Sequence, residues 1–263
     1  MRRRLLGQVA GGAPVIPTPE AGVCTVYPIP IPVTSGLISY VSAFNSCDQF
    51  QVNDRSLSIS ADGDYCSYVD DISGIGNDWR NRSSIPSSTR GAIYNDNGGG
   101  DVFWSTDIAS AKTSWQSDIN WRLNSDVKTI LILCQADSNA LNIAQRMGPH
   151  YSSFRGYART NAGKLEFFQD GIMTSSLITA NTWFVMSIRV NNNVVLGVDK
   201  TYEEVSASAP SNTSSDFTLW AVNTNAGSGY WEGKMREIAI YSGNLSDTDT
   251  DTMVDYMKDK WGL

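Results

Sequence analysis

The chain contains few of the residues that favour helices. Its 263 residues include six Glu and seven Lys, against 32 Ser, 18 Thr and 19 Asn. Glu and Lys are good helix formers, whereas Ser, Thr and Asn compete with the helix backbone for hydrogen bonds. The length and this composition exclude a mostly helical protein and favour one large all-β sandwich or barrel.

Long apolar runs are absent as well. No stretch approaches the roughly 18 consecutive apolar residues that a membrane-spanning helix needs, so we expect no membrane insertion. The chain carries a net charge of −7, and such an acidic body repels phosphate backbones, so we expect no nucleic-acid partner. Aromatic residues make up 10% of the chain, which is ample for a core and excludes intrinsic disorder.

Cysteine and histidine are scarce, which limits metal and catalytic chemistry. The four Cys form no C-x-x-C pair, so zinc-ribbon spacing is absent. Cys134 lies in an apolar run, which predicts a buried and inert thiol. The other three could supply one disulfide, with the pairing left open: Cys24, Cys47 and Cys66. The single His, His150, is expected in a surface turn and offers at most one imidazole base.

Residues 1–34 differ in composition from the rest of the chain. They hold six of the nine prolines and carry a charge of +2, which leaves −9 for residues 35–263. A Pro-Ile-Pro-Ile-Pro run favours extended, polyproline-like structure. The basic start resembles a signal peptide, but the apolar stretch after it is too short, so we expect no Sec export signal. We predict an extended anchoring arm over 1–34, with a flexible tail as the alternative, and a folded domain over 35–263.

Beyond residue 35, short strand-like segments separated by turns indicate an antiparallel β protein. A nearly continuous apolar run over 127–134 predicts a central buried strand, and 183–190 alternates between apolar and polar residues. Asp170-Gly171 after 164–169 is a hairpin signal. Further strands are expected over 194–199, 216–222 and 234–241. The one clear helix follows Ser246 as its N-cap and carries an apolar stripe: Met253, Val254, Met257 and Trp261.

Three stretches together resemble the concanavalin A-like, laminin-G-like jelly-roll domains of bacteria and phages. Residues 35–43 (SGLISYVSA) resemble the opening strand, and 71–78 (DISGIGND) resemble the D-x-SG-x-GND loop. Residues 233–241 (GKMREIAIY) and the final YMKDKWGL resemble the closing strand and the last helix. The resemblance covers about 35–263 and implies an all-β sandwich of two antiparallel sheets with one C-terminal α-helix, preceded by the extended arm.

The 71–78 loop has two interpretations. Its Gly residues permit positive φ, and its polar side chains can cap a tight turn: Asp71, Ser73, Asn77 and Asp78. The resemblance makes calcium the alternative, because some relatives hold calcium in such loops. No D-x-D-x-D-G series supports a metal, so we expect a turn, no metal and no cofactor. Asp62-Gly63-Asp64 is likewise expected to be a turn.

Several jelly-roll relatives cleave glycans, so catalysis is a hypothesis that the resemblance raises. β-Glucanases of this fold carry their carboxylates as E-x-D-x-x-E on one strand, and that pattern is absent. None of the six Glu has an acidic residue two positions later. A Ser-His-Asp unit would depend on His150, and no G-x-S-x-G elbow accompanies it. We therefore expect no enzymatic activity.

A carbohydrate-binding module fits the composition better. Sugar rings stack on exposed aromatic faces, while amides and carboxylates bind their hydroxyls. Aromatic residues near polar loops are the candidate glycan ligands: Trp79, Trp104, Trp115, Trp121, Tyr151 and Trp231, with Tyr157 and Tyr230 beside them. Core packing is the alternative for each Trp, and it is the role that we expect for Trp183, Trp220 and Trp261.

The favoured hypothesis is a structural protein of a bacteriophage particle. A basic, Pro-rich arm ahead of a Ser/Thr/Asn-rich jelly roll resembles head or tail fibres and capsid decoration proteins. The arm would bind other virion proteins through its first residues: Arg2, Arg3, Arg4, Leu5 and Leu6. The jelly roll would project from the virion surface as part of a homo-oligomer and adhere to a host-surface glycan. A free carbohydrate-binding module of a bacterial surface or secreted protein is the alternative, and a glycan-cleaving enzyme of this fold is the second.

Overall fold

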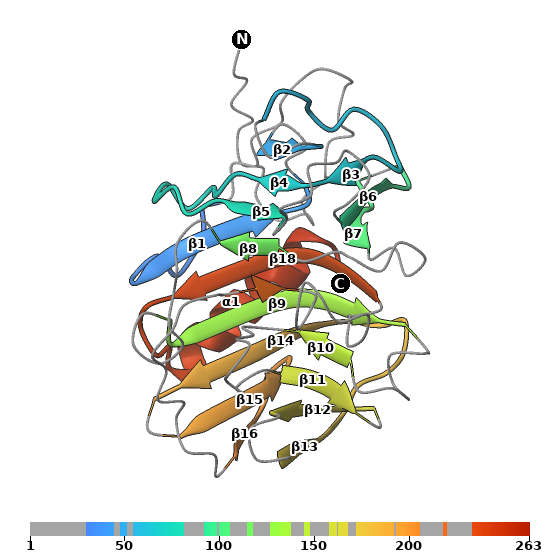
Figure 1. The fold of residues 1–263 in the computed structure, drawn as a ribbon. Coiled ribbons are helices and arrows are strands. Elements are labelled where there is room, and N and C mark those ends of the chain that lie inside the picture. The colour runs from blue at the N-terminus through green and yellow to red at the C-terminus, as the bar shows by residue number, and fades with distance from the viewer. Residues whose placement is uncertain are drawn as a thin grey trace.

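The computed structural model of the chain is a sandwich of antiparallel strands with a helix at its end (Figure 1). The structure describes residues 30–44, 48–51, 55–81, 92–98, 100–105, 115–117, 127–137, 145–147, 158–161, 163–167, 172–191, 193–205, 218–219 and 233–263. The predictions for Cys24, Cys47 and His150 lie outside these residues.

Nine strands form the largest sheet, and neighbouring strands in it are antiparallel. In order along the sheet they are β16 (Thr201–Val205), β15 (Val194–Val198), β14 (Trp183–Val190), β9 (Thr129–Ala136), β18 (Gly233–Tyr241), β7 (Val102–Ser105), β6 (Ala92–Asp96) and β3 (Tyr65–Cys66). The ninth strand, β1 (Leu37–Ser42), pairs with β18. β14 coincides with the segment predicted at 183–190, and β9 begins two residues into the segment predicted at 127–134. The two strands pair near the centre of the sheet, which confirms the central buried strand.

Two smaller sheets form the second layer of the sandwich. The five-stranded sheet contains β17 (Thr218–Leu219), β8 (Trp115–Ser117), β5 (Trp79–Asn81), β4 (Tyr68–Val69) and β2 (Gln49–Phe50). The four-stranded sheet contains β10 (Gln145–Met147), β11 (Ala158–Asn161), β12 (Lys164–Phe167) and β13 (Ile172–Leu177), and β12 pairs with β13 as the predicted hairpin. These layers confirm the predicted all-β jelly-roll sandwich, although the second layer is divided into two sheets.

The core lies between the layers and contains the inner-face side chains of the nine-stranded sheet. Ile130, Ile132 and Cys134 alternate along β9 and are fully buried. Trp104 of β7 meets Trp115 of β8 edge-to-face, with ring centroids 4.9 Å apart, and so joins the two layers. Desolvation raises the pKa of the Cys134 thiol, which keeps it protonated and inert, as predicted.

The outer face of the nine-stranded sheet is covered in part by α1 (Asp247–Lys260), which lies behind the sheet in Figure 1. The Ser246 hydroxyl caps the helix by accepting a hydrogen bond of 3.1 Å from the backbone N–H of Asp249. The predicted apolar stripe is buried: Met253, Val254, Met257 and Trp261. In the last turn, the ammonium of Lys260 pairs with the buried carboxylate of Glu237 in β18. Across the described segments, no helix combines the length and the apolar character that crossing a membrane requires.

The end of the predicted arm belongs to the folded body. Ile31 and Val33 pack against the core, and the backbone carbonyl of Val33 accepts a hydrogen bond of 3.0 Å from the hydroxyl of Tyr241. The chain therefore joins the sandwich ahead of the predicted boundary at residue 34. Residues 1–29, which include the proposed anchor from Arg2 to Leu6, lie outside the described residues, so their role stays a prediction.

Candidate functional site

Three of the predicted glycan-binding aromatics are core residues. The side chains of Trp79, Trp104 and Trp115 are 0% exposed. Each indole N–H donates to an internal acceptor: Trp79 to the hydroxyl of Ser39 at 3.0 Å, Trp104 to the amide oxygen of Gln49 at 2.6 Å, and Trp115 to the backbone carbonyl of Cys66 at 3.2 Å. Since no ring surface reaches solvent, the structure corrects the prediction for these three residues: they pack the core.

The other predicted aromatics fall into two groups. Trp121, Tyr151 and Trp231 lie outside the described residues, and their role as glycan ligands stays a prediction. Trp261 is buried, as predicted. Trp183, at the start of β14, is only partly buried, so part of its indole reaches the surface.

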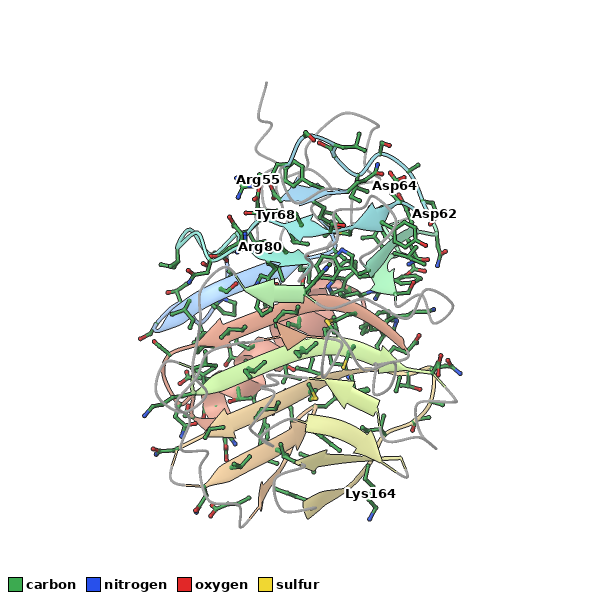
Figure 2. The ribbon with its side chains drawn as sticks, in the orientation of Figure 1. Arg55, Asp62, Asp64, Tyr68, Arg80 and Lys164 are labelled. Atoms are coloured by element: carbon green, nitrogen blue, oxygen red, sulfur yellow. The ribbon has the colours of Figure 1, made fainter. Side chains whose placement is uncertain are left out.

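The segment Asp62-Gly63-Asp64 is a turn, as predicted. The Asp64 carboxylate accepts hydrogen bonds from the backbone N–H groups of Ser60 and Ala61 at 2.8 and 2.9 Å. The Asp62 carboxylate accepts one from the backbone N–H of Asp96 at 2.9 Å. Figure 2 shows both side chains at the same edge of the molecule. Both carboxylates are therefore engaged in hydrogen bonds that fix the backbone around this turn.

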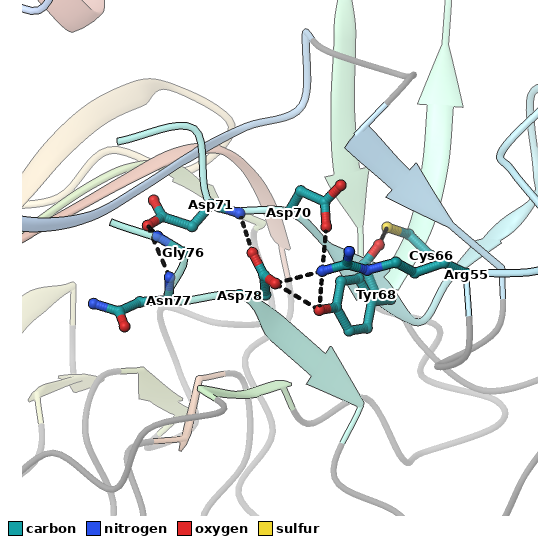
Figure 3. A network of polar contacts seen from close by, with 8 residues as sticks. All are labelled: Arg55, Cys66, Tyr68, Asp70, Asp71, Gly76, Asn77 and Asp78. Carbon is teal, nitrogen blue, oxygen red and sulfur yellow. Dashed lines mark hydrogen bonds and ion pairs between the residues drawn. The ribbon is translucent and has the colours of Figure 1, made fainter. Parts of the chain in front are cut away.

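The 71–78 loop is organised by the carboxylate of Asp71 (Figure 3). It accepts hydrogen bonds of 2.9–3.0 Å from the backbone N–H groups of Ser73, Gly76 and Asn77. A fourth backbone N–H, that of Tyr40 in β1, donates at 2.8 Å. The Ser73 hydroxyl donates a further bond of 2.6 Å. Both Gly residues of the loop have positive φ, so the loop is the tight turn that the sequence predicts.

A second polar cluster, the Arg55 clamp, lies beside this loop and consists of Arg55, Tyr68, Asp70 and Asp78 (Figure 2, Figure 3). One guanidinium nitrogen of Arg55 reaches the Tyr68 hydroxyl and Asp78 at 2.5 Å each, and Asp70 at 2.8 Å. The Tyr68 hydroxyl donates to Asp78 at 2.7 Å. Asp78 also accepts from the backbone N–H of Asp71 at 2.7 Å, which joins the clamp to the loop.

Arg55 offsets part of the negative charge of the clamp. Desolvation raises the pKa of Asp70, and the carboxylates of Asp78 and Asp48 add to the rise while Arg55 opposes it. The guanidinium takes the place between Asp70 and Asp78 that a bound cation would need. Among the described residues, no three His, Cys, Asp or Glu side chains gather in an arrangement that holds a metal. The arrangement is that of a structural clamp.

On the outer face, beside the C-terminal end of α1, six adjacent strands contribute one residue each to a continuous row. We call this set the outer-face row: Tyr65, Ile93, Ser105, Lys234, Gln135 and Trp183. Each member is directly opposite the next in the register of the paired strands. Residues directly opposite one another point to the same face, so the six side chains share one surface. With strands about 4.8 Å apart, the row is about 24 Å long.

The outer-face row combines ring surface with spaced polar groups. Five of its side chains are partly exposed, and Gln135 is 7% exposed. The amide nitrogen of Gln135 donates to the backbone carbonyl of Asn181 at 2.7 Å, which fixes the amide. The ammonium of Lys234 lies 4.5 Å from the ring centroid of Phe103. The row therefore has an aromatic ring at each end, with a hydroxyl, an ammonium and an amide between them.

A β-bulge at Arg236 supports the Trp183 ring. The register of β18 against β9 shifts at this residue, where the other neighbour of β18 changes from β7 to β1. The buried guanidinium lies over Trp183 at 4.2 Å and over Trp261 at 4.5 Å, and it pairs with Asp101. Burial lowers the pKa of Arg236, and Asp101 opposes this. Phe103 meets Trp183 edge-on at 6.3 Å, so the indole is held in one orientation.

The outer-face row is not predicted from the sequence. One signal was present, because Trp183 falls on the same side of its strand as Ser187 and Arg189, the polar positions of the alternation. Which residues of the other strands lie beside Trp183 depends on the register of six strands that are far apart in sequence. Chemically, the row can hold a ligand that has both apolar faces and hydroxyl groups.

No protein-family model matches the sequence, and no curated protein matches it significantly. Solved structures match the fold. Domain 4 of AbnA, a GH43 extracellular arabinanase from Geobacillus stearothermophilus in complex with arabinotriose, is 12% identical, with a TM-score of 0.53 over 84% of this chain and 98% of that domain. A Trypanosoma rangeli sialidase is 12% identical, with a TM-score of 0.51 over 91% of this chain and 36% of the sialidase. The receptor-binding domain of botulinum neurotoxin C/D mosaic serotype is 13% identical, with a TM-score of 0.50 over 85% of this chain and 52% of that domain.

The chain thus spans nearly all of the arabinanase domain, but only 36% of the sialidase and 52% of the neurotoxin domain. At identities of 12–13%, these likenesses establish the fold alone. The chain is a β-sandwich of the jelly-roll type.

Proposed function

We propose that the chain is a carbohydrate-binding, lectin-like domain that holds a glycan on the outer-face row. The observation that carries the proposal is the partly exposed indole of Trp183, fixed by Arg236 and Phe103, in line with an amide, an ammonium and a hydroxyl. The apolar face of a sugar ring packs on such a ring, and its hydroxyls bind the polar groups. The fold shared with an arabinanase domain in complex with arabinotriose supports a glycan over other ligands.

Binding without catalysis is part of this proposal. Glu237 lies three residues from Lys234, but its oxygens are engaged by the hydroxyls of Tyr40 and Ser42 and by the ammonium of Lys260. A carboxylate held in this way is unavailable as a nucleophile or general acid. Release of reducing sugars from a bound glycan would contradict this part of the proposal.

The test is a glycan array probed with the full chain and with Trp183→Ala. We expect binding to at least one glycan and a loss of affinity of about tenfold or more in the variant, because the stacking surface is removed. Trp183→Phe keeps a ring and should retain most of the affinity. Ile75→Ala is the control, since Ile75 is 61% exposed on the 71–78 loop. Absence of any glycan binding, or unchanged binding by a folded Trp183→Ala, would overturn the proposal.

Attachment to a virion is a narrower hypothesis that rests on the arm predicted over 1–34, and its test removes residues 1–29, which precede the core-packing residues Ile31 and Val33. If residues 1–29 bind other virion proteins, a chain that lacks them should fold and should fail to enter phage particles. A truncated chain that is still incorporated would contradict the anchor. The virion surface, the homo-oligomer and the host glycan remain predictions of this hypothesis.

A further inference from the structure

We propose that Lys234 makes the outer-face row selective for an acidic sugar, one that carries a carboxylate or a sulfate; this inference rests on the proposed function. The ammonium of Lys234 lies over the ring of Phe103. Among the described residues, no carboxylate forms an ion pair with it. The two charged residues that follow it in β18 do have ion-pair partners: Arg236 pairs with Asp101, and Glu237 pairs with Lys260.

Lys234 is the only charged member of the outer-face row, so the charge of the row is opposite in sign to the net charge of −7 of the whole chain. Beside the row, Arg236 is paired with Asp101, so this pair adds no net charge. At physiological ionic strength, exposed charges more than about 8 Å apart are largely screened. The nearest cation, rather than the net charge, therefore decides whether an anionic group is held at the row.

The environment of Lys234 strengthens such a contact. The side chain is partly buried, and the Phe103 ring at 4.5 Å holds the ammonium without neutralising it. A cation that has lost part of its hydration and keeps its full charge attracts an anion more strongly than a fully solvated lysine does.

The position of Lys234 in the row suits a sugar. Ser105 and Gln135 are its direct cross-strand neighbours, each about 4.8 Å away along the row. An acidic sugar unit with its anionic group on Lys234 therefore lies between the Ser105 hydroxyl, whose oxygen accepts a hydrogen bond of 2.8 Å from the amide nitrogen of Asn95, and the Gln135 amide, whose nitrogen donates to Asn181. The ring hydroxyls of the sugar would add to these hydrogen bonds. Trp183 lies one strand further on, where the next unit of an oligosaccharide can stack.

The experiment uses matched pairs of glycans that differ only in charge. One pair is an oligogalacturonate and its carboxyl-reduced form; the other is the sulfated and unsulfated form of one oligosaccharide. Binding is measured for the full chain, for Lys234→Gln and for Lys234→Arg, which keeps the positive charge. Lys164→Gln is the matched control, because it removes the same charge from β12 of the four-stranded sheet (Figure 2).

We expect at least one acidic glycan to bind about tenfold more tightly than its neutral partner, the size of a charge-assisted hydrogen bond. Lys234→Gln should abolish this preference, because it weakens binding of the acidic glycan to the level of its neutral partner, while Lys234→Arg and Lys164→Gln should keep the preference. Equal binding of the members of each pair, or a preference that survives in Lys234→Gln, would overturn the role of Lys234. Binding of no glycan at all would instead contradict the proposed function itself.

Discussion

The Arg55 clamp and the outer-face row both gather polar side chains at the surface of the sandwich. They differ in whether their charged groups have ion-pair partners among the described residues. In the clamp, a single guanidinium contacts two carboxylates and the Tyr68 hydroxyl, so each charge meets its opposite within the protein. In the row, the ammonium of Lys234 has an aromatic ring for its neighbour. The number of polar residues therefore does not mark a binding surface. A cation that has no ion-pair partner among the described residues, next to partly exposed ring surface, is the better indication.

The two regions also differ in how the chain builds them. The clamp and its loop come from residues 55–78, so local turns bring most of their hydrogen bonds together. The row takes its members from six strands between residues 65 and 234, and it exists only when the nine-stranded sheet has its full register. Substitutions should therefore act on stability in the first region and on ligand binding in the second.

The largest expected effect on stability belongs to the loop that the clamp supports. Asp71→Ala removes the acceptor of four backbone N–H groups and one hydroxyl. We expect the free energy of unfolding to fall by about 3 kcal/mol or more, because donors that bonded a carboxylate are left unsatisfied. Urea denaturation measures this, with Ile75→Ala as a control in the same loop. A fall of less than about 1 kcal/mol would show that water replaces the carboxylate easily.

Removing the cation of the clamp should have a smaller effect that depends on pH. Arg55→Met leaves Asp70 and Asp78 without their shared partner. Because Arg55 is 45% exposed, solvent screens part of the interaction, and we expect a loss of about 1–2 kcal/mol at pH 7.

The pH dependence follows from Asp70. The pKa of Asp70 is raised in the folded protein, so the folded state binds a proton more readily than the unfolded state does. The ionised carboxylate therefore lowers the free energy of unfolding, and this loss disappears as the pH falls through that pKa. Loss of Arg55, which opposes the rise, moves the pKa further up. The deficit of Arg55→Met relative to the unsubstituted chain should therefore shrink as the pH falls from 7 through the raised pKa of Asp70. A deficit that grows on acidification, in denaturation curves at several pH values, would contradict this account.

The smallest expected effect on stability is that of Lys234→Gln. Since Lys234 has a ring contact but no ion pair among the described residues, we expect a change within about 0.5 kcal/mol. The same urea denaturation measures it, beside Lys164→Gln. A loss as large as that of Arg55→Met would mean that Lys234 serves the fold, and the contrast between the two regions would disappear.

The sequence predicts much of the fold because its signals are local. Alternation in 183–190 and the apolar run at 127–134 report burial directly, and they correspond to the paired strands β14 and β9. The Ser246 cap and the apolar stripe of α1 likewise involve residues a few positions apart. The loop at 71–78 is predicted for the same reason.

The candidate site could not be predicted in this way. Composition places Trp79 and Trp104 near polar segments, but their indoles donate to Ser39 and Gln49, which lie 40 and 55 residues away in the sequence. Their burial depends on how the sheets pack. Trp183 packs against the core, as predicted, but it lies at the start of β14 and stays partly exposed. The burial of Trp79 and Trp104 and the partial exposure of Trp183 both follow from the tertiary arrangement. A single sequence carries little information about that arrangement.

The most direct test compares one residue from each region in a single binding experiment. Isothermal titration with the glycan that binds best on an array should be carried out on the full chain, on Trp183→Ala and on Arg55→Met, below the unfolding transition of each. We predict that Trp183→Ala loses affinity by about tenfold or more, whereas Arg55→Met, although less stable, binds as the full chain does. Loss of binding in Arg55→Met, together with unchanged binding in Trp183→Ala, would contradict the assignment of the outer-face row as the binding surface.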